Sequence, residues 1–152
     1  MVRWDLMTRN SLRRLAIALG TAALVAAASG CVPWMDAPGL IGTRNVSSTN
    51  TQGELDRGRV VNWTGCWPGE NDCVVWLAGH RTTHGSTFAN VPALRPGNFI
   101  RLGYGGKIHH YVVTHSEVVC CTGDIYTPKG GDLVLQTSLG GGRALMVYAD
   151  KV

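Results

Sequence analysis

Three polar side chains stand where apolar runs begin or end, and together they could carry nucleophilic chemistry. His80 follows the run VVWLAG, Ser138 follows LVLQT, and Arg143 opens RALMVYA. A serine hydroxyl acts as a nucleophile when a base takes its proton, and positive charge stabilises a developing oxyanion. A rigid scaffold often presents such groups at the ends of its strands. These three residues are therefore the candidate catalytic set.

The spacing of Ser138 and Arg143 predicts that they lie at one end of a strand pair. Only the glycine-rich residues 139–142 separate them, which is typical of a β-hairpin. A serine nucleophile also needs a base within about 2.6 to 3.2 Å and a partner that orients that base. The sequence alone does not place His80 there, and no carboxylate is recognisable as the partner. Asp132 precedes Ser138 in the same run and would lie roughly 20 Å away.

Six short runs rich in β-branched and aromatic residues predict a mostly β domain. They cover residues 60–63, 73–78, 98–102, 109–119, 132–137 and 143–149. A small closed barrel or a sandwich is favoured, because closure removes exposed strand edges. One or two helical turns are possible within residues 86–94, where Phe88, Val91 and Leu94 recur at a spacing of three.

The chain divides into a leader, a linker and one folded domain. Residues 1–30 have a basic start, an apolar run and small residues before Cys31, which is the layout of an export signal. Lipidation of Cys31 by a lipobox-like mechanism, simple secretion and an uncleaved membrane anchor all stay open. Residues 31–57 are rich in Pro, Gly, Ser, Thr and Asn and predict a flexible tether. Residues 58–152 form the predicted barrel.

Charge gives no support for nucleic-acid binding by the folded domain. The whole chain carries +4, but four arginines and one aspartate lie in residues 1–30, which leaves ten basic and nine acidic residues beyond them. The glycines at 140–142 are not followed by a helix that could bind phosphate. We therefore expect no nucleic-acid partner and no cofactor.

The remaining histidines and cysteines are interpreted as structural. His109, His110 and His115 lie along one predicted strand and are expected to be exposed rather than to bind a metal. Cys66 and Cys73 enclose a short loop, and after export a disulfide between them is favoured over a zinc site that would also use Cys120 and Cys121.

The adjacent pair Cys120 and Cys121 stays open between a disulfide, buried thiols and a displaced nucleophile. We expect no bound metal.

Three motifs, in order along the chain, resemble those of sortases. Residues 77–88 (LAGHRTTHGSTF) resemble the segment that carries the family's catalytic histidine, and residues 94–100 (LRPGNFI) are similar to L-x-x-G-D-x-I, with Asn98 in the place of Asp. Residues 134–138 (VLQTS) resemble T-L-x-T-C, and Arg143 stands where the family's arginine opens the final strand. The A-G-H-R-T-T variant is closest to the class E, housekeeping-like sortases of high-GC Gram-positive bacteria.

The resemblance implies an eight-stranded closed β-barrel with one or two short helices, at the outer face of the cell membrane. It implies a transpeptidase that cuts a sorting motif in a secreted protein and transfers it to an amine of the cell wall. His80, Ser138 and Arg143 would form the catalytic site, with His84, Thr137 and Cys121 near the substrate.

Ser138 occupies the place of the nucleophilic cysteine, and a hydroxyl does not ionise at neutral pH as a thiol can. Two functions stay open: a transpeptidase or hydrolase with weakened or altered activity, and an inactive module that binds peptides. An L,D-transpeptidase is disfavoured, since the chain lacks the S-H-G-C segment of that family.

Overall fold

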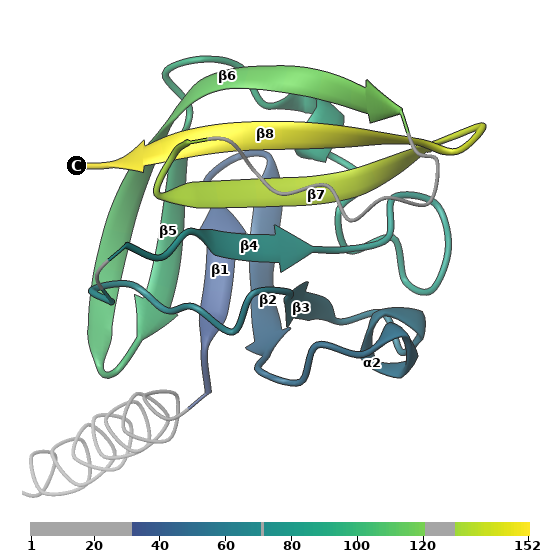
Figure 1. Cartoon of the computed structure of the whole chain (residues 1–152). Helices are drawn as coiled ribbons and strands as arrows, with labels where there is room; N and C mark the ends of the chain where they lie inside the picture. The colour runs from purple at the N-terminus through teal and green to yellow at the C-terminus, as the bar shows by residue number, and fades with distance from the viewer. Residues whose placement is uncertain (1–31, 71, 121–129) are drawn as a thin grey trace, which may run out of the picture. The chain divides into compact units, whose positions relative to one another are not determined.

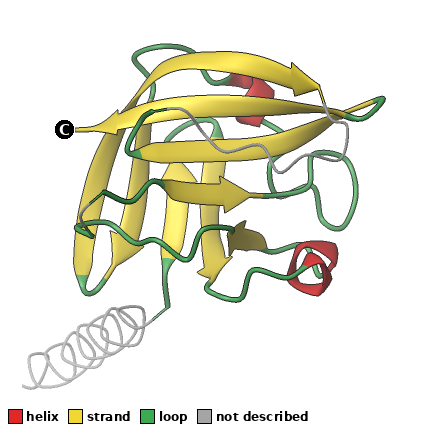
Figure 2. Cartoon of the chain, viewed as in Figure 1, coloured by secondary structure: helices red, strands yellow, loops and turns green. Residues whose placement is uncertain are grey.

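The computed structural model describes residues 32–70, 72–120 and 130–152. In these ranges the chain forms eight strands and two short helices (Figure 1). The strands are β1 (Trp34–Ala37), β2 (Ile41–Ser47), β3 (Val60–Asn62), β4 (Val75–Ala78), β5 (Phe99–Tyr104), β6 (Lys107–Cys120), β7 (Leu133–Gly140) and β8 (Arg143–Lys151). The helices are α2 (Gln52–Asp56) and the 3-10 helix η1 (Val91–Ala93). Figure 2 shows how strands dominate the domain.

The strands close into a barrel in the order β1-β2-β3-β4-β7-β8-β6-β5, and β5 pairs back to β1. Neighbours are antiparallel except for the parallel pairs β2 with β3 and β4 with β7. Closure leaves no open sheet edge, as the short strands require. The prediction of a mostly β, closed barrel of about eight strands with one or two short helices is confirmed.

The flexible tether predicted for residues 31–57 is wrong over its described part, because β1, β2 and α2 lie there. Met35 and Val46 are buried, and β1 pairs with both β2 and β5. Asp36 also accepts two hydrogen bonds from Arg101 of β5, at 2.8 and 2.6 Å. The polar composition misled because four exposed residues separate Ile41 from Val46 within β2, and a barrel strand needs only a few buried side chains.

The leader 1–30 and Cys31 lie outside the described residues, so the export and lipidation predictions stay predictions. Over the ranges that the structure describes, no helix has the length and apolar character needed to cross a bilayer.

β4 and β7 are buried on both faces. Leu77 and Leu135 join the main core cluster, whereas the alternating residues Trp76 and Val134 pack with Tyr148 and Met146 in a second cluster. Parallel strands that are covered on both sides have apolar residues at successive positions, which explains the apolar runs VVWLA and LVL. This central pair is therefore held rigidly from both sides.

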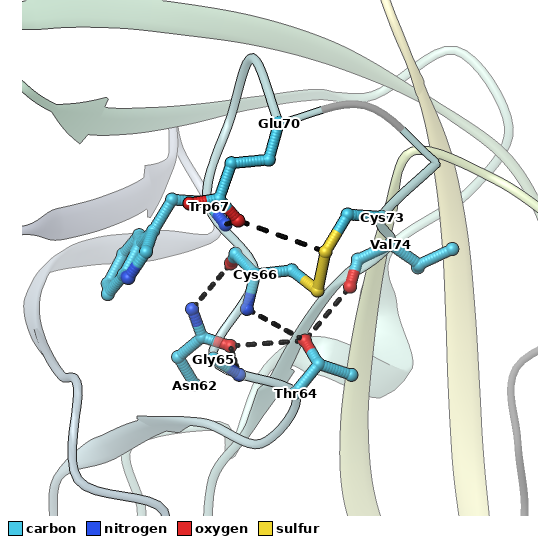
Figure 3. The surroundings of a disulfide bond; sticks show 8 residues. All are labelled: Asn62, Thr64, Gly65, Cys66, Trp67, Glu70, Cys73 and Val74. Carbon is cyan, nitrogen blue, oxygen red and sulfur yellow. Dashed lines mark hydrogen bonds between the residues drawn. A yellow bond between two sulfur atoms is a disulfide. The ribbon is translucent and has the colours of Figure 1, made fainter.

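A disulfide between Cys66 and Cys73 closes the loop that joins β3 to β4 (Figure 3). Their Cα atoms lie 5.8 Å apart. Inside the loop, the Asn62 amide donates to the Cys66 carbonyl at 2.6 Å, and the Glu70 carboxylate accepts from the Trp67 N–H at 2.9 Å. Both sulfurs are bonded to each other, so neither is available as the thiolate that the alternative zinc site would need.

Replacing both Cys66 and Cys73 with serine is expected to lower the free energy of unfolding by about 2 kcal/mol, because the bond restricts the unfolded chain over a short loop. Urea unfolding of the variant and the parent measures the difference. Cys120→Ser, which leaves this disulfide intact, is the control. Equal stability of parent and double variant would contradict the prediction.

Candidate active site

The parallel pairing of β4 with β7 brings His80 and Ser138 to the same edge of the barrel. The register runs from Val75 opposite Leu133 to Ala78 opposite Gln136, and the Gly79 N–H continues it by donating to the Gln136 carbonyl at 3.1 Å. β4 ends at Ala78, and Arg81 then donates to the Ser138 carbonyl at 2.8 Å, so His80 and Ser138 lie at the same edge of the barrel. In Figure 1 the end of β4, the β7–β8 hairpin and α2 all lie on the same side of the barrel.

Asp56, at the end of α2, holds the imidazole of His80. Its Oδ1 lies 3.1 Å from His80 Nε2 and accepts a second hydrogen bond from Gln52 at 2.8 Å. The hydrogen bond from Gln52, followed by that from His80, lowers the pKa of the Asp56 carboxyl below its usual value. An anionic carboxylate on one ring nitrogen orients a histidine for proton transfer at the other. The sequence analysis missed Asp56.

One signal in the sequence could have found this helix. Thr51 stands three residues before Glu54, which is the pattern of a capping box, and its hydroxyl accepts the Glu54 N–H at 3.3 Å. Leu55 then packs against Val61 and Ala78, so α2 rests on the outer side of the strands that lead to His80. The polar composition around this motif obscured it.

Glu54 ties α2 to the chain that follows it. Its side chain is 10% exposed and accepts hydrogen bonds from Arg57 at 2.6 Å and from Arg59 at 3.0 Å. The hydrogen bond from Arg57 is the largest of the interactions that lower the pKa of the Glu54 carboxyl. The position of Asp56 therefore depends on a carboxylate two residues earlier.

His84 lies beside His80, with ring centroids 4.7 Å apart. Its backbone φ of +48° lies in the left-handed region, in a loop that packs against Gly58. A Cβ at Gly58 would collide with the His84 carbonyl oxygen, so a glycine is needed for this approach. The structure thus brings His84, which the resemblance implied to lie near the substrate, next to His80.

Ser138 is exposed near the end of β7. Its Oγ accepts a hydrogen bond from the Gly140 N–H at 3.3 Å. No hydrogen bond joins its hydroxyl to His80 among the described residues. His80 and Ser138 thus lie at the same edge of the barrel, and each has a different hydrogen-bond partner.

Arg81 is a second residue that the sequence analysis passed over. Its Nε donates to the carbonyl of Ser138 at 2.8 Å, and a terminal nitrogen reaches the carbonyl of Leu139 at 3.4 Å. The guanidinium therefore fastens the end of β7 to the segment after β4. The sequence shows an arginine directly after the candidate histidine, but it does not show that its partners are the carbonyls of Ser138 and Leu139.

Arg143 begins β8 beyond the predicted hairpin, which the structure contains. The register sets Ala144 opposite Ser138, and Arg143 opposite Gly140 across a bulge. Arg143 and Ser138 therefore lie at the same end of the β7–β8 hairpin, on either side of the bulge. In the described part of the chain Arg143 makes no hydrogen bond or ion pair.

Thr137 is 1% exposed, and its hydroxyl donates to the Gly79 carbonyl at 2.9 Å. In this structure that hydroxyl holds β7 against β4, on the side opposite to Ser138. Cys121, the other expected substrate neighbour, lies outside the described residues. Cys120 pairs with Arg143 across β6 and β8 and is exposed.

The histidines of β6 do not gather into a site. His115 stacks on Tyr148 with ring centroids 4.5 Å apart, and His109 and His110 lie in the part of β6 that pairs with β5. The described histidine and carboxylate ligands that do approach one another are those around His80.

The family model of the sortase domain matches residues 35–150. The chain belongs to the sortase family. All the motifs that carried the resemblance fall inside this range. Asn98, which replaces the motif's aspartate, accepts the Arg95 N–H at 2.8 Å.

Solved sortases share this fold. Sortase E1 from Streptomyces coelicolor is 22% identical with a TM-score of 0.67, covering 80% of this chain and 88% of its own. Sortase E from Streptomyces avermitilis is 23% identical with a TM-score of 0.65, covering 81% and 89%. Sortase A from Corynebacterium diphtheriae is 19% identical with a TM-score of 0.67, covering 80% and 60%. The class E structures agree with the resemblance seen in the sequence, whereas a search of curated proteins finds no match.

Replacing Glu54 with glutamine is expected to destabilise the barrel near pH 7 and to matter less as the solution is acidified. The folded-state pKa of Glu54 is lowered, so its carboxylate stabilises the fold above its unfolded pKa of about 4.5, and this contribution is lost as pH falls through the folded pKa. Urea unfolding at pH 7, 5 and 3.5 measures the difference in free energy of unfolding between Glu54→Gln and the parent. Asp150→Asn, at an exposed position, is the control. A difference between Glu54→Gln and parent that does not change with pH would contradict the prediction.

Proposed function

We propose that this chain is a weakened sortase-type acyl-transfer enzyme in which Ser138 is the nucleophile and His80, oriented by Asp56, is its base. The observation that carries the proposal is the 3.1 Å contact between His80 Nε2 and Asp56 Oδ1. A thiolate needs only a positive environment, whereas a serine hydroxyl requires an oriented base. Asp56 is the carboxylate partner that this chemistry demands.

The proposed reaction begins when the Ser138 hydroxyl gives its proton to His80 as Oγ bonds to the carbonyl carbon of a peptide. The C–N bond then breaks, and His80 returns the proton to the leaving amine, which leaves an ester on Ser138. An acceptor amine or water attacks the ester carbonyl, and its proton passes through His80 back to the departing Ser138 oxygen. Because Asp56 holds Nε2, Nδ1 is the ring nitrogen that exchanges the proton.

Two arginines support this scheme in different ways. Arg81 positions the nucleophile, since it binds the carbonyls of Ser138 and Leu139. Arg143, which the resemblance implies as the arginine that stabilises the acyl oxyanion, has a side chain without a hydrogen-bond partner in the described chain. In this proposal its guanidinium is available to bind the oxyanion, because it begins β8 at the end of the hairpin that carries Ser138.

The substrate proposed is an extended sorting-motif peptide of a secreted protein, with a cell-wall amine as acceptor. Sortase E1 from Streptomyces coelicolor was solved with a tripeptide in its active site, and the shared fold supports a peptide ligand here. His84 and Cys121 are proposed substrate neighbours, whereas the buried hydroxyl of Thr137 is already used. We place the protein outside the cell at the membrane, exported by residues 1–30 and retained by a lipid on Cys31 or an anchor.

A second candidate is an inactive barrel that binds such peptides without cutting them. Ser138 Oγ accepts from the Gly140 N–H and makes no hydrogen bond to His80 within the described chain, which favours this alternative. Loss of peptide binding in Arg143→Ala, with no chemistry in parent or variant, would support it. Absence of all peptide binding would exclude both candidates.

Replacing Asp56 with asparagine is expected to slow acylation of Ser138 by about 10²- to 10⁴-fold while peptide affinity stays unchanged, because the residue orients the base and does not contact the peptide. Mass spectrometry of the chain mixed with sorting-motif peptides follows the acyl-enzyme, and fluorescence anisotropy follows binding. Asp150→Asn is the matched control. Equal acylation rates in Asp56→Asn and parent would contradict a positioning role.

Replacing Ser138 with alanine is expected to abolish the acyl-enzyme, because no other group forms the ester. Replacing it with cysteine is expected to raise turnover, since a thiol with a pKa of about 8.5 is readily held as a thiolate. The same mass-spectrometric assay compares both variants with the parent. Turnover by Ser138→Cys together with no acyl-enzyme in the parent would exclude native catalysis and favour the binding module.

A further inference from the structure

Three metal-ligating side chains from separate segments converge at His80. Asp56 comes from the end of α2, His80 follows β4, and His84 lies in the next loop. One ligand atom from each lies within 4.8 Å of the other two. The sequence analysis expected no metal and did not consider this cluster, whose members are spread over 29 positions of the chain.

The fold holds these three residues in place. Gly58, two residues after Asp56, touches the backbone of the His84 loop so closely that a Cβ would meet the His84 carbonyl. Gly79 is packed against the Phe88 ring, and the Phe88 N–H donates to the His80 carbonyl at 2.9 Å. The segments that carry the ligands are therefore anchored by backbone contacts, independently of any ion.

We propose that Asp56, His80 and His84 bind a divalent transition-metal ion, with zinc as the best-suited one. Two imidazoles, one carboxylate and an open fourth position make up a common zinc site. Zinc bonds of about 2.0 to 2.1 Å set neighbouring ligand atoms in a tetrahedron roughly 3.3 Å apart. The present 3.1 Å between His80 Nε2 and Asp56 Oδ1 matches this spacing. A ligand atom of His84 lies within 4.8 Å of both, so its side chain would have to move closer by up to about 1.5 Å to complete the tetrahedron.

The surroundings of the three ligands suit a cation. Gln52 donates to Asp56 Oδ1 at 2.8 Å, the kind of outer hydrogen bond that orients a ligating carboxylate. The nearby arginines are engaged elsewhere: Arg57 with Glu54, and Arg81 with the carbonyls of Ser138 and Leu139. Among the described residues, neither guanidinium forms an ion pair with Asp56, whose carboxylate is half-exposed.

Metal binding has a consequence for the activity, and this part rests on the proposed function. If Nε2 of His80 binds zinc, the single proton of the neutral ring is on Nδ1, so Nδ1 cannot take the proton of Ser138. Asp56 likewise cannot orient the ring while it ligates the ion. Bound metal and base catalysis therefore exclude each other. Zinc would act as a reversible inhibitor that a chelator removes.

Titration of the full-length chain in detergent with zinc, monitored by calorimetry after alkylation of free thiols, tests the binding. The parent is expected to bind one ion, and His84→Asn is expected to weaken that binding at least about tenfold. Asparagine tolerates the left-handed backbone at position 84, so this variant keeps the loop. His110→Asn, on the exposed part of β6, is the matched control and is expected to bind as the parent does.

Failure of the parent to bind zinc, or equal affinity in His84→Asn, would overturn the proposal. Asp56→Asn gives a second check and is also expected to bind at least about tenfold more weakly. Ser138→Ala removes the proposed nucleophile but no ligand, and it is expected to bind zinc like the parent. Zinc binding with no acyl-enzyme in the metal-free parent would therefore reject the proposed function and leave the metal site standing.

Discussion

The parallel hydrogen-bond ladder between β4 and β7 is the constraint on which the rest of the site depends. Both strands are buried on both faces, so neither can slide or tilt without opening two apolar clusters. The ladder runs through the Gly79 N–H and is reinforced by the Thr137 hydroxyl. His80 and Ser138, which are 58 residues apart in sequence, lie at the same edge of the barrel because parallel strands finish at the same edge.

The remaining parts of the site are attached to that edge by polar contacts. Arg81 fastens the Ser138 and Leu139 carbonyls to the segment after β4, and α2 brings Asp56 to His80. α2 has only five residues and little intrinsic stability, so it depends on the packing of Leu55 and on the buried carboxylate of Glu54. The proposed catalytic pair of His80 and Asp56 is thus supported by an apolar contact and an ion pair away from its own side chains.

Serine at the position of the family's nucleophile changes which neighbouring groups are needed to activate that nucleophile. A thiolate depends on nearby positive charge, whereas a hydroxyl depends on a base held in one orientation. Asp56 supplies this orientation, but with His84 it also makes the base a metal ligand. In the two proposals, the same side chains serve proton transfer and its inhibition, and occupancy by a metal ion decides between them.

The sequence by itself determined the barrel and the candidates His80 and Ser138, because continuous apolar runs and their flanking motifs are local signals. The Cys66–Cys73 pairing was also within reach, since a short loop limits the partners. Only the tertiary structure showed that β1 and β2 belong to the barrel, that Asp56 holds His80, and that a bulge separates Ser138 from Arg143. These facts depend on strand pairing and register between distant segments, and on a bulge at one hairpin. Composition and spacing along a single chain carry no information about such contacts.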